Sequence, residues 1–502
     1  TVLIAAPRPL AVFRSTGATP PFPARQLGLG SPRHPAMDQS ERTEMPHDAA
    51  LAELARFLGD RLSRSRSDRA AHGQNEAWFP ETPPDAVAFP ETVEEVARIV
   101  AICARHGCPV TAWGTGTALE GHALAVRGGL SLDLARMNRI LSVRAEDMQA
   151  VVQPGVTREA LNAELRATGL MFPIDPGANA SLGGMAATRA SGTTAVRYGT
   201  MRDNVMALQV VLADGRVIRT GSGARKSSAG YDLTGLFVGS EGTLGIITEL
   251  TLRLHGQPEA ISAAVCAFDD FEAAVQTVIA TIQMGTPMAR IEFVDETTAA
   301  IFNKANGTRL PEKPHLMIEF HGSDRAVAED ARRFGEVVAE MGGGHFDWAT
   351  TPEDRTRLWK MRHGAYRAAI ASRPGCMGLV TDLCVPISRL AEAVRETRED
   401  IATAGIPGPI LGHVGDGNFH AILLIDRANA EELSTAKALA RRMAERALRL
   451  GGTITGEHGV GMGKKELMAM EHGEAWEVMA RIKRALDPDG ILNPGKVVEV
   501  NQ

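Results

Sequence analysis

The sequence predicts an α+β protein with more than one domain. A chain of 502 residues is longer than one hydrophobic core usually serves, and this length suggests about three domains. Before Pro258, short strand-like runs are separated by glycine-rich loops, whereas strands and longer helices alternate from Ile261 to Leu450. Glycine-rich loops return after Gly451. These observations indicate two dissimilar domains, followed by a glycine-rich C-terminal segment.

Composition and charge exclude several classes of protein. The hydrophobic fraction of 44% and charged fraction of 23% are those of an ordinary globular protein. A net charge of −6 argues against nucleic acid as the main partner. No apolar run approaches the roughly 18 residues of a transmembrane helix, so we expect any membrane contact to be peripheral. The five scattered cysteines form no CxxC pair, which argues against an iron–sulfur cluster and favours a reducing compartment.

Residues 1–37 differ from the rest of the chain. They contain four arginines, seven prolines and no acidic residue. An Arg-bearing, acid-free stretch is typical of an organelle transit peptide, but the prolines would interrupt the amphipathic helix of such a signal. We expect a disordered extension here, with a transit peptide as the alternative.

The first domain opens with a helix, a strand and a glycine loop. Thr92 and Glu95 predict a capping box for a helix over 92–106, with Gly107 as its C-cap. The apolar run 109–113 predicts a strand that leads into Gly-Thr-Gly-Thr at 114–117, and 129–134 predicts another strand. A glycine loop after a strand is typical of phosphate binding by backbone amides. A plain turn explains this short motif equally well, and the dinucleotide-binding fingerprint is absent because no helix follows directly.

The next elements surround a long segment of small residues. Residues 150–153 predict a strand and 157–167 a helix ending at Gly169. Pro, Gly, Ser and Thr then dominate 173–199, which we expect to lack regular structure and to wrap an extended polar ligand. A strand pair turning at Asp214-Gly215 and a strand over 244–254 complete the domain. In the second domain we expect a strand over 315–320 and helices over 326–341 and 388–404.

A hairpin in the second domain carries two histidines. Asp416-Gly417 lies between apolar runs, which is a strong signal for a two-residue β-turn. Counting outward from that turn places His413 opposite His420, on one face of the hairpin. Two imidazoles held in this way suit one divalent metal ion, with nitrogen ligands at about 2.1 Å. A surface hairpin with two unrelated histidines is the alternative.

The Gly456-Glu-His-Gly-Val-Gly461 loop favours the metal site over that alternative. Its glycines leave few side chains to bury, which suggests backbone passing close to a ligand. Glu457 could supply a third, carboxylate ligand, and His458 would stay free for proton transfer. The pattern therefore predicts an enzyme site with an open metal position.

Taken together, these segments resemble the FAD-linked oxidases and dehydrogenases of the vanillyl-alcohol oxidase / p-cresol methylhydroxylase (PCMH) superfamily, most of all the D-lactate dehydrogenase (cytochrome) and glycolate oxidase catalytic-subunit group. The motifs that carry the resemblance are AWGTGTALEGH, PGANASLGGMAATRASGTTAVRYGTMRDNV, GSEGTLGIIT, GHVGDGNFH, TGEHGVG and ILNPGK. It implies an N-terminal extension with a leading helix (1–77), a PCMH-type FAD-binding domain of two subdomains (78–257), an α+β cap domain holding the substrate (258–450) and a C-terminal segment that returns to the flavin (451–502).

The resemblance also implies a set of site residues. FAD would contact the loop around 114–117 and the long segment, with Glu241, Gly242 and Ile247 nearer the adenine and Asn493 beside the isoalloxazine. Thr115 and Thr117 stand where some relatives carry a flavin-linked histidine, so we expect noncovalent FAD. The full set for the cofactor is Trp113, Gly114, Thr115, Gly116, Thr117, Pro176, Gly177, Ser181, Gly183, Gly184, Ser191, Gly192, Tyr198, Glu241, Gly242, Ile247 and Asn493.

The implied chemistry is oxidation of a D-2-hydroxy acid. A divalent metal (Zn, Mn or Fe) on His413, His420 and Glu457 would bind the substrate hydroxyl, His458 would take its proton, and Arg362 would grip the carboxylate. Close relatives that act on D-2-hydroxyglutarate carry a lysine where this chain has Val380. D-lactate or a longer apolar analogue is therefore the expected substrate, with D-2-hydroxyglutarate or glycolate as alternatives.

The resemblance also suggests an electron acceptor and a cellular location. Because no haem or nicotinamide motif is evident, electrons would pass to a separate acceptor: cytochrome c, electron-transferring flavoprotein or a quinone-linked partner. We expect a cytoplasmic enzyme, peripheral at the inner membrane, or a mitochondrial one in a eukaryote, and a homodimer is left open. The rival hypotheses are a direct oxidase that uses oxygen, a metal hydrolase without flavin, and a non-catalytic binding protein.

Overall fold

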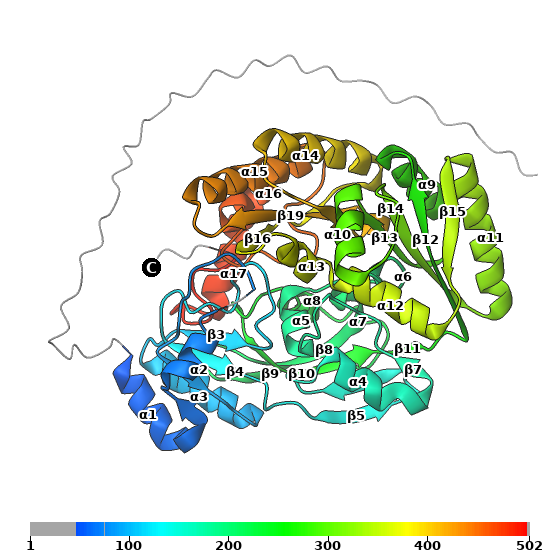
Figure 1. The fold of residues 1–502 in the computed structure, drawn as a ribbon. Helices are drawn as coiled ribbons and strands as arrows, with labels where there is room; N and C mark the ends of the chain where they lie inside the picture. Colours follow the sequence, from blue (N-terminus) through cyan, green and yellow to red (C-terminus); the bar gives the residue numbers. More distant parts are fainter. Residues whose placement is uncertain (1–46, 75, 499–502) are drawn as a thin grey trace, which may run out of the picture. The chain divides into compact units, whose positions relative to one another are not determined.

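Three larger β-sheets, with helices packed on them, make up the part of the chain that the computed structural model describes, residues 47–74 and 76–498 (Figure 1). The stretch 1–37, which we expected to be disordered, lies outside these residues. Within the described part, no helix has the length and apolar character needed to cross a membrane.

The first sheet has four strands in the order β1-β2-β4-β3. They are β1 (Leu62–Ser63), β2 (Ala86–Ala88), β3 (Val110–Trp113) and β4 (Leu130–Asp133). Helix α3 (Val93–Arg105) packs on it through apolar residues three or four positions apart. Thr92 caps α3 by accepting from the Glu95 amide at 3.2 Å. Only half of the expected capping box forms, because the Glu95 carboxylate binds the Glu91 amide and Arg61 instead.

Both ends of the described chain join this first sheet. Helix α1 (Asp48–Leu58) is the expected leading helix, and its apolar face packs with α3. After it, β1 pairs with β2, and α2 (Arg66–Ala71) follows, so the segment before residue 78 is part of the sheet and not only an extension. At the other end, the Val110 amide donates to the Ile491 carbonyl and the Asn493 amide to the Val110 carbonyl, both at 2.8 Å. The C-terminal segment therefore returns to β3.

The second sheet has five antiparallel strands in the order β5-β6-β10-β8-β9. They are β5 (Ile140–Arg144), β6 (Gln149–Val152), β8 (Val205–Val211), β9 (Val217–Gly221) and β10 (Ile246–Arg253). Helix α4 (Arg158–Leu165), capped by Thr157, and a short 3₁₀ turn end at Gly169 as expected. The short strands β7 (Leu170–Met171) and β11 (His255–Gly256) pair with each other, and α8 (Leu233–Phe237) follows β9.

The small-residue segment is more regular than we expected. The stretch from 173 to 180 is irregular, but three short helices follow: α5 (Leu182–Thr188), α6 (Ala195–Tyr198) and α7 (Met201–Asn204). Gly183 of α5 packs closely against Pro154, where a Cβ would come within 2.4 Å of the Pro154 side chain and 2.9 Å of its Cα. Tertiary packing therefore outweighs the low helix propensity of the sequence.

The third sheet is the largest, with strand order β15-β12-β14-β13-β18-β19-β16 and β17 beside β19. Its strands are β12 (Ala260–Phe268), β13 (Met288–Val294), β14 (His315–Gly322), β15 (Gly343–Ala349), β16 (Cys376–Val380), β17 (Leu383–Cys384), β18 (Ile410–Gly412) and β19 (Asn418–Asp426). Its helices are α9 (Phe271–Gln283), α10 (Glu296–Asn306), α11 (Asp324–Glu340), α12 (Pro352–His363), α13 (Ala365–Ser372), α14 (Leu390–Ala404) and α15 (Ala430–Arg449), followed by α16 (Met468–His472) and α17 (Glu474–Leu486).

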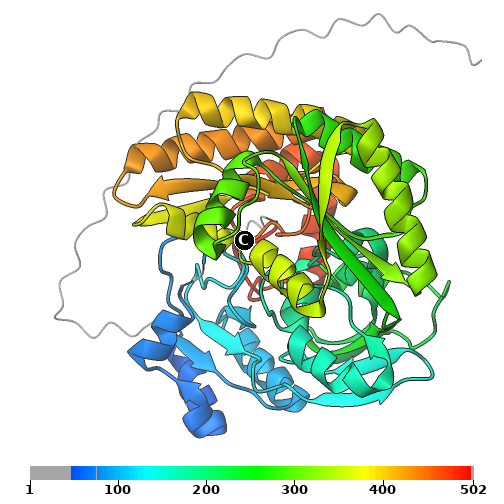
Figure 2. The same ribbon diagram turned by 45° about the vertical axis from the view of Figure 1, so that its right-hand side comes forward.

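Helices cover both faces of this sheet (Figures 1 and 2). Side chains of a strand alternate between faces, and the hydrophobic clusters follow that alternation. Ile318 of β14 packs in the cluster that includes residues of α9, α11, α14 and α15, whereas Met317 packs with residues of α10, α12 and α13. On β13, the second face carries Arg290, Glu292 and Val294.

The histidine hairpin has a different register from the one we predicted. His420 is paired with Leu411, not with His413. The connection is longer than a two-residue turn, because Val414–Asp416 form a 3₁₀ turn and only Gly417 has a positive φ, +75°. A shift of two residues keeps the same face of each strand, and the two imidazole rings still lie 5.5 Å apart.

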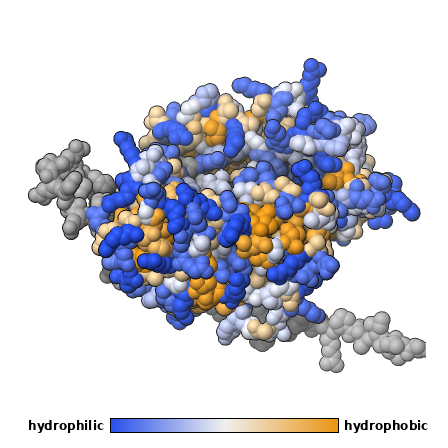
Figure 3. Space-filling view, turned by 90° about the horizontal axis from the view of Figure 1, so that it is seen from below, coloured by the Kyte–Doolittle hydropathy of each residue, from blue (hydrophilic) through white to orange (hydrophobic). Residues whose placement is uncertain are grey.

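Seen from below, the surface carries hydrophobic residues in separate patches among hydrophilic ones (Figure 3).

Candidate active site

A cavity of about 2050 Å³ gathers the predicted site residues. It is lined by the loop after β3, the segment before and within α5, and the inner face of the third sheet, together with His458 and Asn493. Of the residues we expected to hold cofactor, metal or substrate, all line this cavity except Gly192 and Tyr198. The structure therefore brings together segments that lie more than 300 residues apart in the sequence.

One wall of the cavity is made of backbone and small polar groups. Ser181 stands before the first turn of α5, and its Oγ is buried without a hydrogen-bond partner among the described residues. A Cβ at Gly114 would come within 2.4 Å of that Oγ, so the loop and the start of α5 can approach this closely only with glycine there. An unpaired hydroxyl beside a glycine loop fits a phosphate group.

Glu241 lies in the cavity lining beside Asn493 and the C-terminal loop. The Asn493 side chain donates to its carbonyl at 2.7 Å, and its carboxylate accepts from the Val460 and Gly461 amides, both at 2.7 Å. His122 is 3.3 Å from the same carboxylate. Glu241 and Asn493, expected nearer the adenine and beside the isoalloxazine respectively, are thus in direct contact, and which part of FAD each would face stays a prediction.

The three expected metal ligands converge on one point. Glu457 Oε1 is 3.0 Å from His413 Nε2 and 3.3 Å from His420 Nε2. Three ligand atoms about 2.1 Å from a tetrahedral metal ion would be about 3.4 Å apart, so the set fits one divalent cation. Burial alone would raise the pKa of Glu457, but the neighbouring imidazoles hold it well below its usual range. The carboxylate is therefore ionised, as a ligand must be.

Asp382 organises the loop that carries Glu457 and His458. Its buried carboxylate accepts from the two amides of these residues, at 2.9 and 2.8 Å, and from Thr455 Oγ1 at 2.6 Å. It also accepts from Asn418 Nδ2 at 2.7 Å. Burial opposes its charge, yet the nearby His458 and a lysine hold the pKa of Asp382 well below its usual range.

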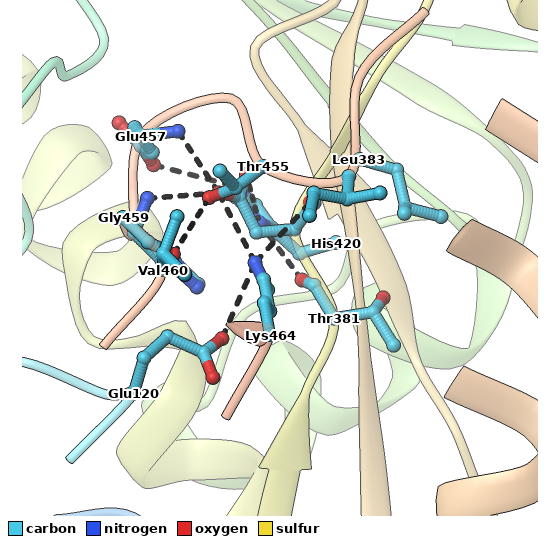
Figure 4. A network of polar contacts seen from close by, with 12 residues as sticks. Glu120, Thr381, Leu383, His420, Thr455, Glu457, Gly459, Val460 and Lys464 are labelled. Atoms are coloured by element: carbon cyan, nitrogen blue, oxygen red, sulfur yellow. Dashed lines mark hydrogen bonds and ion pairs between the residues drawn. The ribbon is translucent and has the colours of Figure 1, made fainter. Parts of the chain in front are cut away.

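That lysine is Lys464, which is itself buried. In Figure 4 it extends between Glu120 and the segment that contains Thr381 and Leu383, close to His420. Its Nζ lies 3.2 Å from Glu120 and 3.6 Å from Asp382. A buried ammonium between two carboxylates locks the loop to both β17 and the segment after β3.

His458 stacks on His420, with ring centroids 4.9 Å apart and an interplanar angle of 7°. Its Nδ1 is buried and has no hydrogen-bond partner among the described residues. Burial, the largest influence, lowers the pKa of His458 to about 4. The imidazole is therefore neutral at pH 7, which is the form that can accept a proton.

Arg362 enters the cavity from the last turn of α12. It is buried, and its Nη2 lies 2.6 Å from Glu292 Oε2. Nη2 and Nε nevertheless form no hydrogen bond within the described part of the chain, since the contact with Glu292 is poorly aligned. Buried guanidinium donors without acceptors fit a carboxylate ligand. Glu292 also accepts from His413 Nδ1 at 2.7 Å.

The wall formed by β13 and β14 is polar as well. Tyr198, expected at the flavin, instead hydrogen-bonds His321 Nδ1 at 2.7 Å, and His321 Nε2 is 2.7 Å from Glu319. Gly192, also expected there, lies against Asp175, where a Cβ would be 2.6 Å from the Asp175 backbone. Between the metal ligands and this wall, the cavity lining is partly apolar and includes Val265, Val380, Leu411 and Ile422.

Several residues of this site had no role predicted from the sequence. Glu292 and Glu319 are single carboxylates inside apolar strands, MARIEFV and HLMIEFHG. A charged residue in such a run is costly to bury without a partner, and this signal could have identified both. Glu120, His122 and Lys464 lie in motifs with no comparable signal, because their partners are distant in sequence.

Comparisons with known proteins identify the family. A family model described as "FAD linked oxidases, C-terminal domain" matches residues 257–497, and one described as "FAD binding domain" matches residues 84–221. A probable mitochondrial D-lactate dehydrogenase from Danio rerio is 47% identical over 483 residues, which cover 94% of this chain and 97% of that protein. A mitochondrial D-lactate dehydrogenase (cytochrome) from Arabidopsis thaliana is 42% identical over 466 residues, 92% of this chain and 82% of that protein.

Solved structures show the same fold. The structure of p-cresol methylhydroxylase with substrate bound superposes with a TM-score of 0.75 at 20% identity, covering 92% of this chain and 98% of that chain. The expected α+β, PCMH-type fold is thereby confirmed. The family models and the relatives show that the alternatives of a hydrolase without flavin and of a non-catalytic binding protein are wrong. The glycine-lined wall, with its unpaired Ser181 hydroxyl, fits the FAD that the matched domain binds. The chain belongs to the FAD-linked oxidases and is a FAD-dependent oxidoreductase.

Proposed function

We propose that this enzyme oxidises D-lactate, or a longer apolar D-2-hydroxy acid, to the 2-oxo acid. The observation that carries the proposal is the meeting of four functions in one cavity: a glycine-lined cofactor wall, a possible metal-ligand group, a neutral histidine and an arginine with free donors. The names of the Danio rerio and Arabidopsis thaliana relatives, both D-lactate dehydrogenases, support the substrate. The D configuration is taken from those relatives alone.

A divalent cation held by His413, His420 and Glu457 is part of the proposal. Bound there, it would supply Lewis acidity toward the substrate hydroxyl, and bound FAD would supply the two-electron acceptor. Two imidazole nitrogens and a carboxylate oxygen are ligands that zinc, manganese and iron all accept. Thr115 and Thr117, whose hydroxyls lie 3.2 Å apart, offer no histidine for a covalent flavin link, so we propose noncovalent FAD.

The protein's own residues would bind and orient the substrate. Arg362 would bind the substrate carboxylate through its guanidinium donors. Binding at that end would determine which substrate atoms face the metal ligands. His458 would accept the hydroxyl proton on a ring nitrogen, a role supported by its place beside Glu457 and its stacking on His420. Arg362, His413 and His420 are themselves buried, which would limit the access of water to these groups.

The apolar lining supports a substrate with one carboxylate. Val380 and Ile422 line the cavity at the third sheet, and neither can pair with a second carboxylate. A second carboxylate held against this apolar face, such as that of D-2-hydroxyglutarate, would be buried and unpaired, at a cost of several kcal/mol. The same apolar lining would also suit an apolar side chain longer than the methyl group of lactate.

We further propose that electrons leave for a separate acceptor. The word cytochrome in the name of the Arabidopsis thaliana relative favours a cytochrome over an electron-transferring flavoprotein or a quinone-linked partner. If the chain comes from a eukaryote, the mitochondrial relatives favour a mitochondrial location.

An anaerobic absorbance spectrum tests the proposal. Purified protein, reconstituted with FAD and Zn²⁺ or Mn²⁺, should show flavin bands that bleach with D-lactate but not with L-lactate, glycolate or D-2-hydroxyglutarate. Oxidised cytochrome c should then restore the bands faster than air does. Bleaching by D-2-hydroxyglutarate or glycolate alone would refute the substrate, and rapid reoxidation by air with peroxide formation would favour a direct oxidase.

A further inference from the structure

Glu292 occupies an unusual position at the centre of the inner face of the third sheet. It lies on β13, is 1% exposed, and points toward the same side as His420 of the neighbouring hairpin. Its two carboxylate oxygens contact different partners. Oε1 accepts from His413 Nδ1 at 2.7 Å, and Oε2 lies 2.6 Å from Arg362 Nη2.

We propose that Glu292 is a positioning residue that couples the metal-binding end of the site to the carboxylate-binding end. It is not in the possible metal-ligand group itself, which consists of His413, His420 and Glu457. It would act through His413 on one side and Arg362 on the other. This inference rests on the proposed function of those two residues.

The contact with His413 fixes which nitrogen faces the ligand point. Because Nδ1 is engaged with Glu292, Nε2 is the nitrogen that lies 3.0 Å from Glu457. A carboxylate on the far nitrogen of a metal-binding imidazole sets its tautomer, fixes its ring orientation and increases its basicity. Losing such a partner typically weakens metal binding by about 10–100-fold.

The contact with Arg362 serves a second purpose. A buried guanidinium without a counter-charge is strongly unfavourable, and Glu292 is the ion-pair partner of Arg362 among the described residues. The poor alignment of that pair leaves Nη2 and Nε without a hydrogen bond. Glu292 therefore lies against Nη2 as the counter-charge of Arg362 and leaves the Nε donor, which has no hydrogen-bond partner among the described residues, for a substrate carboxylate.

One carboxylate serving both groups has a measurable consequence. Removing its charge should weaken metal binding and substrate binding together, whereas a change at Arg362 should weaken substrate binding alone. A purely structural carboxylate would give neither pattern, since it would lower stability without moving either binding constant.

The test compares Glu292→Gln with Arg362→Gln and with Glu319→Gln, all reconstituted with FAD. Glu319 is a matched control because it is a buried carboxylate on the adjacent strand β14, paired with Arg290 and His321. Metal affinity is measured by titrating metal-free holoprotein with Zn²⁺ or Mn²⁺, and the KM and kcat for D-lactate are measured at saturating metal. The flavin spectrum and melting temperature report folding.

For Glu292→Gln we expect metal affinity to fall by about 10–100-fold and KM to rise by about tenfold or more as the grip of Arg362 weakens. Arg362→Gln should raise KM and leave metal affinity unchanged, and Glu319→Gln should leave metal affinity unchanged. If Glu292→Gln fails to fold, Glu292→Asp keeps the charge but shortens the reach, and it should restore the ion pair with Arg362 better than the contact with His413.

The inference is overturned if the folded Glu292 variant keeps either the wild-type metal affinity or the wild-type KM. The proposed function fails in a different way. In that case the wild-type protein itself would need no metal, or D-lactate would not reduce its flavin.

Discussion

The Asp382→Asn substitution tests how the loop carrying Glu457 and His458 is held in place. Oδ2 of Asp382 accepts from three donors, at 2.6, 2.8 and 2.9 Å, and Oδ1 accepts from Asn418 at 2.7 Å. An asparagine has only one oxygen, so in either orientation its NH₂ group faces a donor. The substitution also removes the negative charge 3.6 Å from Lys464.

The size of the effect follows from these contacts. Breaking a buried ion pair costs about 3–5 kcal/mol, and the lower value applies here because Lys464 keeps Glu120 at 3.2 Å. If the loop opens locally, about 3 kcal/mol corresponds to roughly 150-fold easier opening. A global melting curve would not report this local opening of the loop well, since a chain of this length need not unfold in one step.

Hydrogen exchange measured by mass spectrometry is therefore the suitable assay. The Glu457 and His458 amides should exchange roughly 150-fold faster in Asp382→Asn than in wild type. Asp295→Asn is the control: Asp295 is also buried, but it caps α10, where asparagine serves equally well, so exchange in the 456–461 loop should not change. Unchanged exchange of that loop in a folded Asp382→Asn protein would refute the role assigned to Asp382.

Four further predictions concern the cofactor, the metal and the substrate. His458→Ala should keep FAD but lower kcat by about 10²–10⁴-fold, and wild-type turnover would show that His458 is not the base. His413→Ala should abolish activity while the flavin bands remain, and removing the metal from the wild-type protein with a chelator should do the same. Added Zn²⁺ or Mn²⁺ should restore activity to the chelated protein but not to His413→Ala. Turnover that resists the chelator would exclude a metal role. Gly183→Ala should weaken FAD binding in a fluorescence titration, because its Cβ would lie 2.4 Å from the Pro154 side chain, and an unchanged titration would show that the wall adapts. Val380→Lys should raise D-2-hydroxyglutarate turnover relative to D-lactate, and an unchanged ratio would place the distal group elsewhere.

Local patterns in the sequence predicted most elements of the fold. Apolar periodicity and caps identified α3, α4 and α11 to within a few residues, because these signals lie inside one element. The long glycine- and serine-rich segment indicated a ligand wall, although its short helices were missed. Those helices form because neighbouring backbone packs against glycines such as Gly183, which no local propensity expresses.

The sequence by itself determined which residues to expect at the site: His413, His420, Glu457, His458 and the glycine loops. Only the tertiary structure decided how they meet. It replaced the expected two-residue turn with a longer one, so that Leu411 faces His420, and it placed Glu241 against the C-terminal loop. It also brought Glu292 to His413 and Asp382 to Lys464, pairs separated by 121 and 82 residues. A buried charge needs a partner, but the residues next to it in the sequence do not indicate which distant residue the fold places beside it.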